Sequence, residues 1–361
     1  MSAANDVRRS GKEIKLSQEE FYERFNQRYE DPAYDKMRPQ IQELAAIAYK
    51  AYHEGRKAPK TVKAGLGFED PDYDLNVEWV KASQAIKQAD LRRKSAKRPR
   101  VLIINGSDRN DQTCPGEISK SSRLIALAKD EMEKSSSGEI DIDVLELNTM
   151  TSEYGKTIYP CKGCVSTAMP LCHWPCSCYP HNSLGQVNDW MNEIYPRWVE
   201  ADGIMIVTPV YWRQAPSTLK LMIDRMVCAD GGNEDPTSTQ GKTPELAKKL
   251  EIKGWDYPRH LKGRVYSIVV HGDTEGIDDL KTMLSSWLDA MELIPAGTMP
   301  TLARFIGYYE DYATSHRALD KDEAIQKEVR NSAKALYKTL VELREGGLKS
   351  DQQDLDDPRP K

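Results

Sequence analysis

From residue 100 onward, short apolar runs alternate with longer segments of helical periodicity. The apolar runs predict strands at residues 101–104, 140–147, 204–207, 265–270 and 293–306. The periodic segments predict helices at residues 121–134, 186–201, 217–227, 277–291 and 321–343. Short unbroken apolar runs suit strands that are buried on both faces. Strands that alternate with helices in this way predict a parallel, doubly wound sheet.

Five such units predict an α/β fold with a five-stranded parallel sheet in the flavodoxin-like order 2-1-3-4-5. Residues 1–98 differ, because a capping box at Ser17 and Glu20 and helical spacing at 37–52 and 77–91 predict a helical N-terminal extension. The flavodoxin-like domain is then expected at residues 99–346. The segment 347–361, rich in Asp, Gln and Pro, is expected to be disordered.

Charge and hydropathy exclude two classes of protein. The net charge is −5, divided into +4 over residues 1–98 and −9 over the remainder, which argues against a dedicated nucleic-acid binder. The longest apolar runs, 101–104 and 203–210, fall far short of the roughly 20 residues that a membrane-spanning helix needs. The first 20 residues carry four basic side chains without an apolar stretch, unlike a secretory signal. We therefore expect a cytoplasmic protein.

Ligands of open α/β sheets bind at the carboxyl ends of the strands, so the loops there are the first place to look for function. The first strand is followed by Ser107 and Arg109, and Ser121 and Ser122 then open a helix, with Lys120 as a further candidate. Hydroxyls, backbone N–H groups and a helix N-terminus together can hold a phosphate. An ordinary serine-rich helix cap is the alternative. Neither a dinucleotide-binding glycine motif nor a P-loop is present.

The loops after the third and fourth strands carry a second group of candidates. These are Pro209, Val210, Tyr211, Trp212, His271, Gly272 and Asp273. The aromatic side chains suit a planar ring, and the glycine permits close approach of the backbone to a ligand. The alternatives are aromatics that only cover the core edge and a histidine with a structural role.

Taken together, these loops resemble those of NAD(P)H-dependent FMN reductases. The resemblance rests on Gly106-Ser107-x-Arg109 with the later Ser121-Ser122, on the segment 200–212, and on Asp224-Arg225 at the end of the next helix. It implies a flavodoxin-like fold that binds FMN without a covalent bond. By the same resemblance, Ser107, Arg109, Ser121 and Ser122 hold the phosphate, and residues 209–212 and 271–276 face the flavin ring.

The resemblance also implies a function. An FMN-dependent oxidoreductase of this kind takes hydride from NAD(P)H and passes electrons to a small acceptor, which is a quinone, a flavin, a nitro- or azo-aromatic compound or a metal ion. It implies a homodimer or homotetramer as well. The alternative is an electron-transfer protein with FMN, or FMN and an iron–sulfur cluster, and no NAD(P)H turnover. Such carriers are usually strongly acidic, so the moderate charge of residues 99–361 favours the enzyme.

Five of the seven cysteines lie within eighteen residues. They are Cys161, Cys164, Cys172, Cys176 and Cys178. In a chain expected to be cytoplasmic, such density favours metal or redox chemistry over structural disulfides. The opening CxxC step resembles that of the iron–sulfur flavoproteins within the same family. Three interpretations stay open: a [4Fe–4S] cluster, a tetrahedral zinc site and free thiols.

Overall fold

The computed structural model describes residues 15–297 and 301–347. The chain forms two compact units, one of residues 1–61 with 179–187 and the other of residues 62–178 with 188–361. The expected boundary at residue 98 therefore lies inside the larger unit. From residue 348 on, the tail that we expect to be disordered lies outside the described residues.

The smaller unit is helical. It contains α1 (Gln18–Asn26), α2 (Arg38–Glu54) and 3₁₀ turns at Gln27–Tyr29, Pro32–Met37 and Asn182–Leu184. The predicted capping box is confirmed, because the Glu20 amide donates to Ser17 Oγ at 3.2 Å and the Ser17 amide donates to Glu20 Oε2 at 2.9 Å. The Phe21 ring lies 5.4 Å from Tyr49 and 5.1 Å from Tyr52, so aromatic side chains join α1 to α2 within this unit.

The larger unit is built on a parallel sheet, and the predicted α/β fold class is confirmed. Its strands are β3 (Arg100–Asn105), β4 (Asp141–Glu146), β5 (Gly203–Pro209), β6 (Val265–Gly272), β7 (Ile294–Pro295) and β8 (Thr301–Phe305). The strands run in the order β4-β3-β5-β6, and β7 and β8 both pair with β6. The single strand predicted at 293–306 is therefore divided in two.

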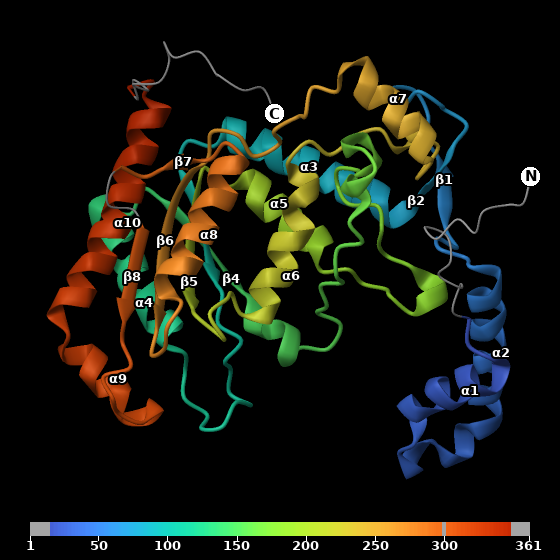
Figure 1. Cartoon of the computed structure of the whole chain (residues 1–361), viewed down its shortest axis with the longest axis horizontal. Coiled ribbons are helices and arrows are strands. Elements are labelled where there is room, and N and C mark those ends of the chain that lie inside the picture. The colour runs from blue at the N-terminus through green and yellow to red at the C-terminus, as the bar shows by residue number, and fades with distance from the viewer. Residues whose placement is uncertain (1–14, 298–300, 348–361) are drawn as a thin grey trace, which may run out of the picture. The chain divides into compact units, whose positions relative to one another are not determined.

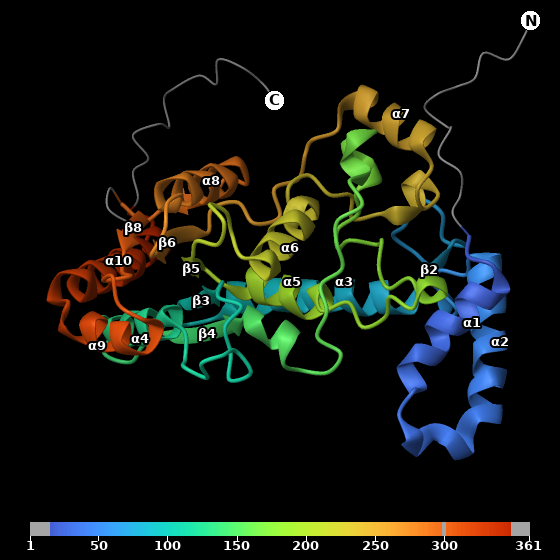
Figure 2. The same ribbon diagram turned by 60° about the horizontal axis from the view of Figure 1, so that its bottom comes forward.

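Helices cover both faces of this sheet (Figures 1 and 2). They are α4 (Lys120–Ser135), α5 (Met191–Glu200), α6 (Ser217–Arg225), α8 (Ile277–Ala290), α9 (Tyr312–Lys321) and α10 (Glu323–Arg344). One core lies between α4, α10 and the alternate strand residues Val101, Ile103 and Met205, all fully buried. Their neighbours Leu102, Ile104 and Ile204 point to the opposite face and are equally buried, as expected for a sheet covered on both sides.

The helix α3 (Val77–Ser95) explains why the larger unit begins before residue 98. It packs along α5, and its Trp79 indole donates a buried hydrogen bond of 2.8 Å to the Pro175 carbonyl. At its last turn the Arg92 guanidinium donates to both carboxylate oxygens of Glu200, at 3.0 and 2.8 Å. The buried side chains of α3, Trp79, Ala82, Ile86 and Ala89, thus place the helix in the larger unit, although it precedes the first strand of the parallel sheet.

Three smaller elements complete the larger unit. The strands β1 (Thr61–Lys63) and β2 (Asp74–Asn76) form a two-stranded sheet, and α7 (Pro244–Gly254) lies in the long insertion between α6 and β6. Across the described ranges, no helix combines the length and apolar character that a membrane crossing requires.

Candidate functional site

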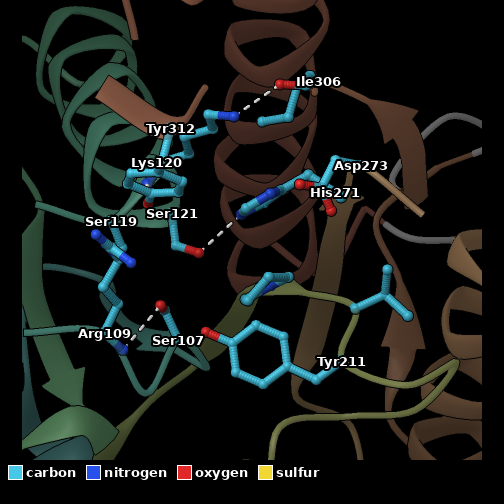
Figure 3. Close-up of a pocket in the computed structure, with 13 residues that line it drawn as sticks. Ser107, Arg109, Ser119, Lys120, Ser121, Tyr211, His271, Asp273, Ile306 and Tyr312 are labelled. Carbon is cyan, nitrogen blue, oxygen red and sulfur yellow. Dashed lines mark hydrogen bonds between the residues drawn. The ribbon is translucent and has the colours of Figure 1, made fainter. Parts of the chain in front are cut away.

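A cavity opens at the carboxyl ends of β3, β5 and β6 (Figure 3). Most of the predicted candidates line it together: Ser107, Arg109, Ser121, Pro209, Val210, Tyr211, His271, Gly272 and Asp273. Lys120, the further candidate, also lines it. The loops meet here because parallel strands bring their carboxyl ends to one edge of the sheet.

Close packing shapes the loop that leaves β3. A Cβ atom on Gly106 would lie 2.6 Å from Thr208 Oγ1 on β5, so only glycine lets the two strand ends approach this closely. Asn105 then holds the turn, since its Oδ1 accepts from the Ser107 amide at 3.1 Å and its Nδ2 donates to Glu146 Oε2 at 2.6 Å. The Ser107 hydroxyl is thereby held at the cavity wall.

The N-terminus of α4 forms the polar end of the cavity. Ser119 is the N-cap residue, and its Oγ accepts from the Ser122 amide at 3.0 Å. The first turn of a helix carries unpaired N–H groups and a partial positive charge, both favourable to an anion. The Lys120 and Ser121 side chains project from this turn into the cavity.

Two cationic side chains converge on this polar end. The Arg109 guanidinium carbon lies 3.8 Å from the centre of the Tyr312 ring, and Arg109 Nε donates to the Glu117 carbonyl at 3.2 Å. The Lys120 ammonium donates to the Ile306 carbonyl at 2.9 Å. Burial lowers the pKa of Lys120, whereas the Asp273 carboxylate opposes that change. Arg109 is therefore held by its own loop and by α9, and Lys120 by the segment that follows β8.

His271, at the end of β6, is fully desolvated. Its Nε2 lies 2.7 Å from Ser121 Oγ, across the cavity wall between β6 and α4 (Figure 3). Burial, and secondarily the charge of Lys120, lowers the pKa of His271 to about 3. The imidazole is consequently neutral at physiological pH, and its hydrogen bond with Ser121 Oγ joins β6 to α4.

Pro209, Val210 and Tyr211 form a less polar wall opposite α4. The Val210 amide donates to the His271 carbonyl at 2.9 Å, which continues the pairing of β5 with β6 beyond the strands. Tyr211 lies on the cavity side of its loop (Figure 3). The next residue, Trp212, has a φ of 47° and is 97% exposed, so its ring lies outside the cavity.

Residues 99–303 match the family described as NADPH-dependent FMN reductase. The chain belongs to this family. As a member it is an NAD(P)H-dependent FMN oxidoreductase, and the predicted resemblance is confirmed. The match covers the sheet from β3 into β8 and the cavity residues from Ser107 to Asp273, whereas Ile306 and Tyr312 lie beyond it.

Solved structures that are similar to this chain include RosB, an azoreductase and a quinone oxidoreductase. RosB with a bound 8-demethyl-8-formylriboflavin-5′-phosphate intermediate is 15% identical, with 73% of this chain and 91% of that chain covered and a TM-score of 0.46. The azoreductase AzrA is 14% identical, with coverage of 66% and 99% and a TM-score of 0.37. The NAD(P)H:quinone oxidoreductase from Methanothermobacter marburgensis is 13% identical, with coverage of 66% and 96% and a TM-score of 0.38. No curated protein sequence matches this chain.

The chemistry of the cavity fits the cofactor of the family. Arg109, Lys120, two serine hydroxyls and the N-terminus of α4 make a donor set for a phosphate monoester, which carries nearly two negative charges. Pro209, Val210 and Tyr211 supply the apolar and aromatic surface that a planar ring needs. FMN carries a phosphate at one end and a flat isoalloxazine ring at the other, joined by a ribityl chain.

Two predicted residues of this FMN reductase do not line the cavity. Trp212 points outward, and Ser122 turns into the helix cap, where its Oγ lies 2.8 Å from Ser119 Oγ and 3.1 Å from Asn105 Nδ2. Three lining residues were not predicted, Ser119, Ile306 and Tyr312. Ser119 is recognisable as an N-cap residue, whereas Tyr312 lies on α9, a helix that the sequence analysis did not predict.

The cysteine segment, residues 161–178, does not support the iron–sulfur or zinc interpretation. Among residues 15–297 and 301–347, no group of three or more Cys, His, Asp or Glu side chains is arranged to hold a metal. All seven cysteines are free thiols. Burial is the first cause that raises the pKa of Cys172, and a hydrogen bond with Cys178, followed by burial, raises that of Cys176.

Proposed function

We propose that the cavity binds FMN with its phosphate at the N-terminus of α4 and its ring along residues 209–211, and that the bound enzyme uses NAD(P)H to reduce a small acceptor. The observation that carries this proposal is the convergence of Arg109 and Lys120 with the Ser119 and Ser121 hydroxyls at one helix N-terminus. Few groups other than a phosphate would satisfy so many donors at once. When bound, FMN supplies the hydride and electron chemistry of the reaction.

The chain's own residues bind and orient in this proposal. Arg109 and Lys120 neutralise the phosphate, and their contacts with Tyr312 and the Ile306 carbonyl limit the entropy lost when an anion binds. His271 holds the Ser121 hydroxyl by a hydrogen bond without adding a charge. Asp273 lies near Lys120 and balances part of the positive charge, so the cavity remains selective for a single anionic group.

The acceptor side of the proposal rests on the exposed loop after β5. Tyr211 lines the cavity and Trp212 stands in solvent beside it, so aromatic surface flanks the entrance. We infer that the acceptor is a planar molecule, a quinone, a free flavin or a nitro- or azo-aromatic compound, which stacks at this entrance. A metal-ion acceptor has no comparable group of ligands among the described residues.

Equilibrium titration with FMN tests the binding proposal. Arg109→Gln and Lys120→Gln should each weaken FMN binding by about 10- to 100-fold, the effect of losing one charge-assisted contact. Arg123→Gln is the matched control, because Arg123 lies on the same helix but pairs with Asp320 and does not line the cavity. Unchanged FMN affinity in both cavity variants, or an equal loss in the control, would contradict the proposal.

Turnover is measured separately. The FMN-loaded protein should oxidise NADPH or NADH in the presence of a quinone, a flavin or an azo dye, and Trp212→Ala should raise KM for the acceptor while FMN affinity stays unchanged. Failure to oxidise either nucleotide with any of these acceptors would leave FMN binding intact but overturn the oxidoreductase proposal for this cavity.

A further inference from the structure

A pair of thiols in the larger unit plays no part in the FMN cavity. Cys164 Sγ and Cys178 Sγ lie 3.4 Å apart, and both cysteines are free. A disulfide requires a sulfur–sulfur distance of about 2.05 Å, so a shift of roughly 1.4 Å would join them. Fourteen positions separate the two residues in the sequence, so their approach is a product of the fold.

The two thiols differ in exposure. Cys164 is half-buried at the start of a 3₁₀ turn (Cys164–Ser166), with exposed Gly163 and Ser166 on either side of it. Cys178 is buried. A reagent from solution therefore reaches Cys164 first, and Cys178 is positioned behind it.

The surroundings of Cys164 favour its thiolate. The hydrogen bond from Cys178, assisted by the charge of Lys242, lowers the pKa of Cys164 to about 6, although burial opposes this. The Lys242 ammonium is anchored to the Leu171 carbonyl at 2.7 Å. Burial of Lys242 disfavours the charge of its ammonium group. The surrounding cysteines, of which Cys178 and Cys164 have the largest effect, raise the pKa of Lys242 and keep it cationic. Cys164 is thus the activated member of the pair.

The neighbouring thiols have different environments. Cys172 and Cys176 are buried and their pKa values are raised, so they stay protonated. Burial likewise raises the pKa of Cys228. The Cys161 sulfur accepts only a long hydrogen bond of 3.4 Å from the Gly163 amide. Reactivity in the segment is therefore concentrated at Cys164.

We propose that Cys164 and Cys178 form a reversible dithiol–disulfide pair that exchanges with low-molecular-weight disulfides. The Cys164 thiolate attacks one sulfur of the disulfide RSSR, so that a Cys164–S–S–R bond forms, the RS–SR bond breaks and RS⁻ leaves to take up a proton. The Cys178 thiol then loses its proton, attacks the Cys164 sulfur and releases the second RS⁻. The two cysteines lose two electrons and two protons, and RSSR becomes two RSH.

Peptide mapping after equilibration with glutathione tests the pair directly. The full chain is incubated at several ratios of oxidised to reduced glutathione, quenched in acid, alkylated and digested. Trypsin cleaves after Lys162 and chymotrypsin after Leu171, so a double digest separates Cys164 from Cys161 and from the peptide that carries Cys172, Cys176 and Cys178. Fragmentation of the cross-linked peptide in the mass spectrometer then identifies which of these three sulfurs is joined to Cys164. We expect a Cys164–Cys178 cross-linked peptide that disappears on reduction. Cys161→Ser is the matched control and should retain it.

Two further readouts follow from the same experiment. Cys164→Ser and Cys178→Ser should each remove the cross-link, and iodoacetamide at pH 7 should alkylate Cys164 about 10-fold faster than Cys161 in the reduced wild-type protein. A disulfide that instead joins Cys161 to Cys164 or Cys176 to Cys178, or none at any glutathione ratio, would overturn the proposal. The mapping of the wild-type protein decides this without any variant.

Discussion

The FMN cavity and the cysteine segment both place a buried lysine beside a titratable side chain, with opposite results. Lys120 helps burial to lower the pKa of His271, and the imidazole loses its charge. Lys242 helps Cys178 to lower the pKa of Cys164, and the thiol gains a charge. A nearby cation stabilises whichever form of its neighbour carries less positive charge. The same physical effect thus produces a neutral hydrogen-bonding group in one region and a nucleophile in the other.

Arg225 shows that a nearby cation can be outweighed. The hydrogen bond with Cys178 and burial raise the pKa of Cys176 by more than the Arg225 charge lowers it, so the thiol stays protonated. The Arg225 guanidinium is fully buried and donates to both carboxylate oxygens of Asp189, at 3.1 and 2.6 Å. Asp189 is thus the charged partner of Arg225, whereas Lys120 and Lys242 bind uncharged carbonyls.

The largest effect is expected when this partner is removed. Asp189→Asn leaves the Arg225 charge uncompensated in the core and should lower the free energy of unfolding by about 3–5 kcal/mol. Urea denaturation measures it. The double variant Asp189→Asn/Arg225→Met removes both charges and should recover part of the loss. A single variant as stable as the wild type would contradict the role assigned to this ion pair.

The neutral state of His271 predicts a pH dependence of stability. Between pH 6.5 and about 3 the unfolded chain binds a proton on this histidine that the folded protein does not. The free energy of unfolding should therefore decrease as the pH is lowered through this window, by up to about 1.4 kcal/mol per pH unit. Above pH 6.5 the histidine should make no contribution to the pH dependence. His271→Gln lacks the effect, so the difference between wild type and variant isolates it. Identical pH profiles would show that His271 is charged or solvated.

A smaller effect is expected at Lys242. Lys242→Met should raise the pKa of Cys164 and slow its alkylation at pH 7 by about 2- to 10-fold, because the hydrogen bond from Cys178 remains as the larger cause. Lys248→Met is the control, since Lys248 is exposed and pairs with Glu251. The pH profile of alkylation gives the pKa of each protein. Equal profiles would exclude a contribution of Lys242 to the thiolate.

The smallest effect is expected for a cation in solvent. Arg92→Gln removes a pair with Glu200 that is more than half exposed on the arginine side, so the free energy of unfolding should change by less than about 1 kcal/mol. Urea denaturation at low and high salt measures it. A larger loss would mean that the exposure of an ion pair does not determine how much it contributes to the free energy of unfolding, in contrast to the difference expected between this pair and the buried pair of Asp189 and Arg225.

The sequence predicts the cavity better than the cysteine segment for a physical reason. Buried parallel strands fix where their carboxyl ends lie, so the residues after β3, β5 and β6 could be brought together without coordinates. Residues 160–178 contain only short 3₁₀ turns, and no periodicity fixes which sulfur atoms meet. The approach of Cys178 to Cys164 therefore required the structure.

Details within the cavity were also beyond the sequence. Whether Ser121 or Ser122 faces the ligand depends on the rotation of the first turn of α4, which the cap at Ser119 sets. The outward position of Trp212 follows from its positive φ, a conformation that residue type does not predict for tryptophan. Tyr312 reaches the cavity from 190 residues further along the chain than Ser122, and it is held there by the Arg109 guanidinium over its ring and by a hydrogen bond of 3.2 Å from the Lys120 amide to its hydroxyl.

The central claim is that the polar end of the cavity binds a phosphate, and one measurement tests it most directly. FMN and riboflavin share the same ring and differ in the phosphate, so the ratio of their affinities for the wild-type protein reports that contact alone. We predict that FMN binds at least about 100-fold more tightly than riboflavin, as expected for two charge-assisted contacts, and that Arg109→Gln/Lys120→Gln removes most of the difference. Equal affinity of the wild-type protein for FMN and riboflavin would contradict the account.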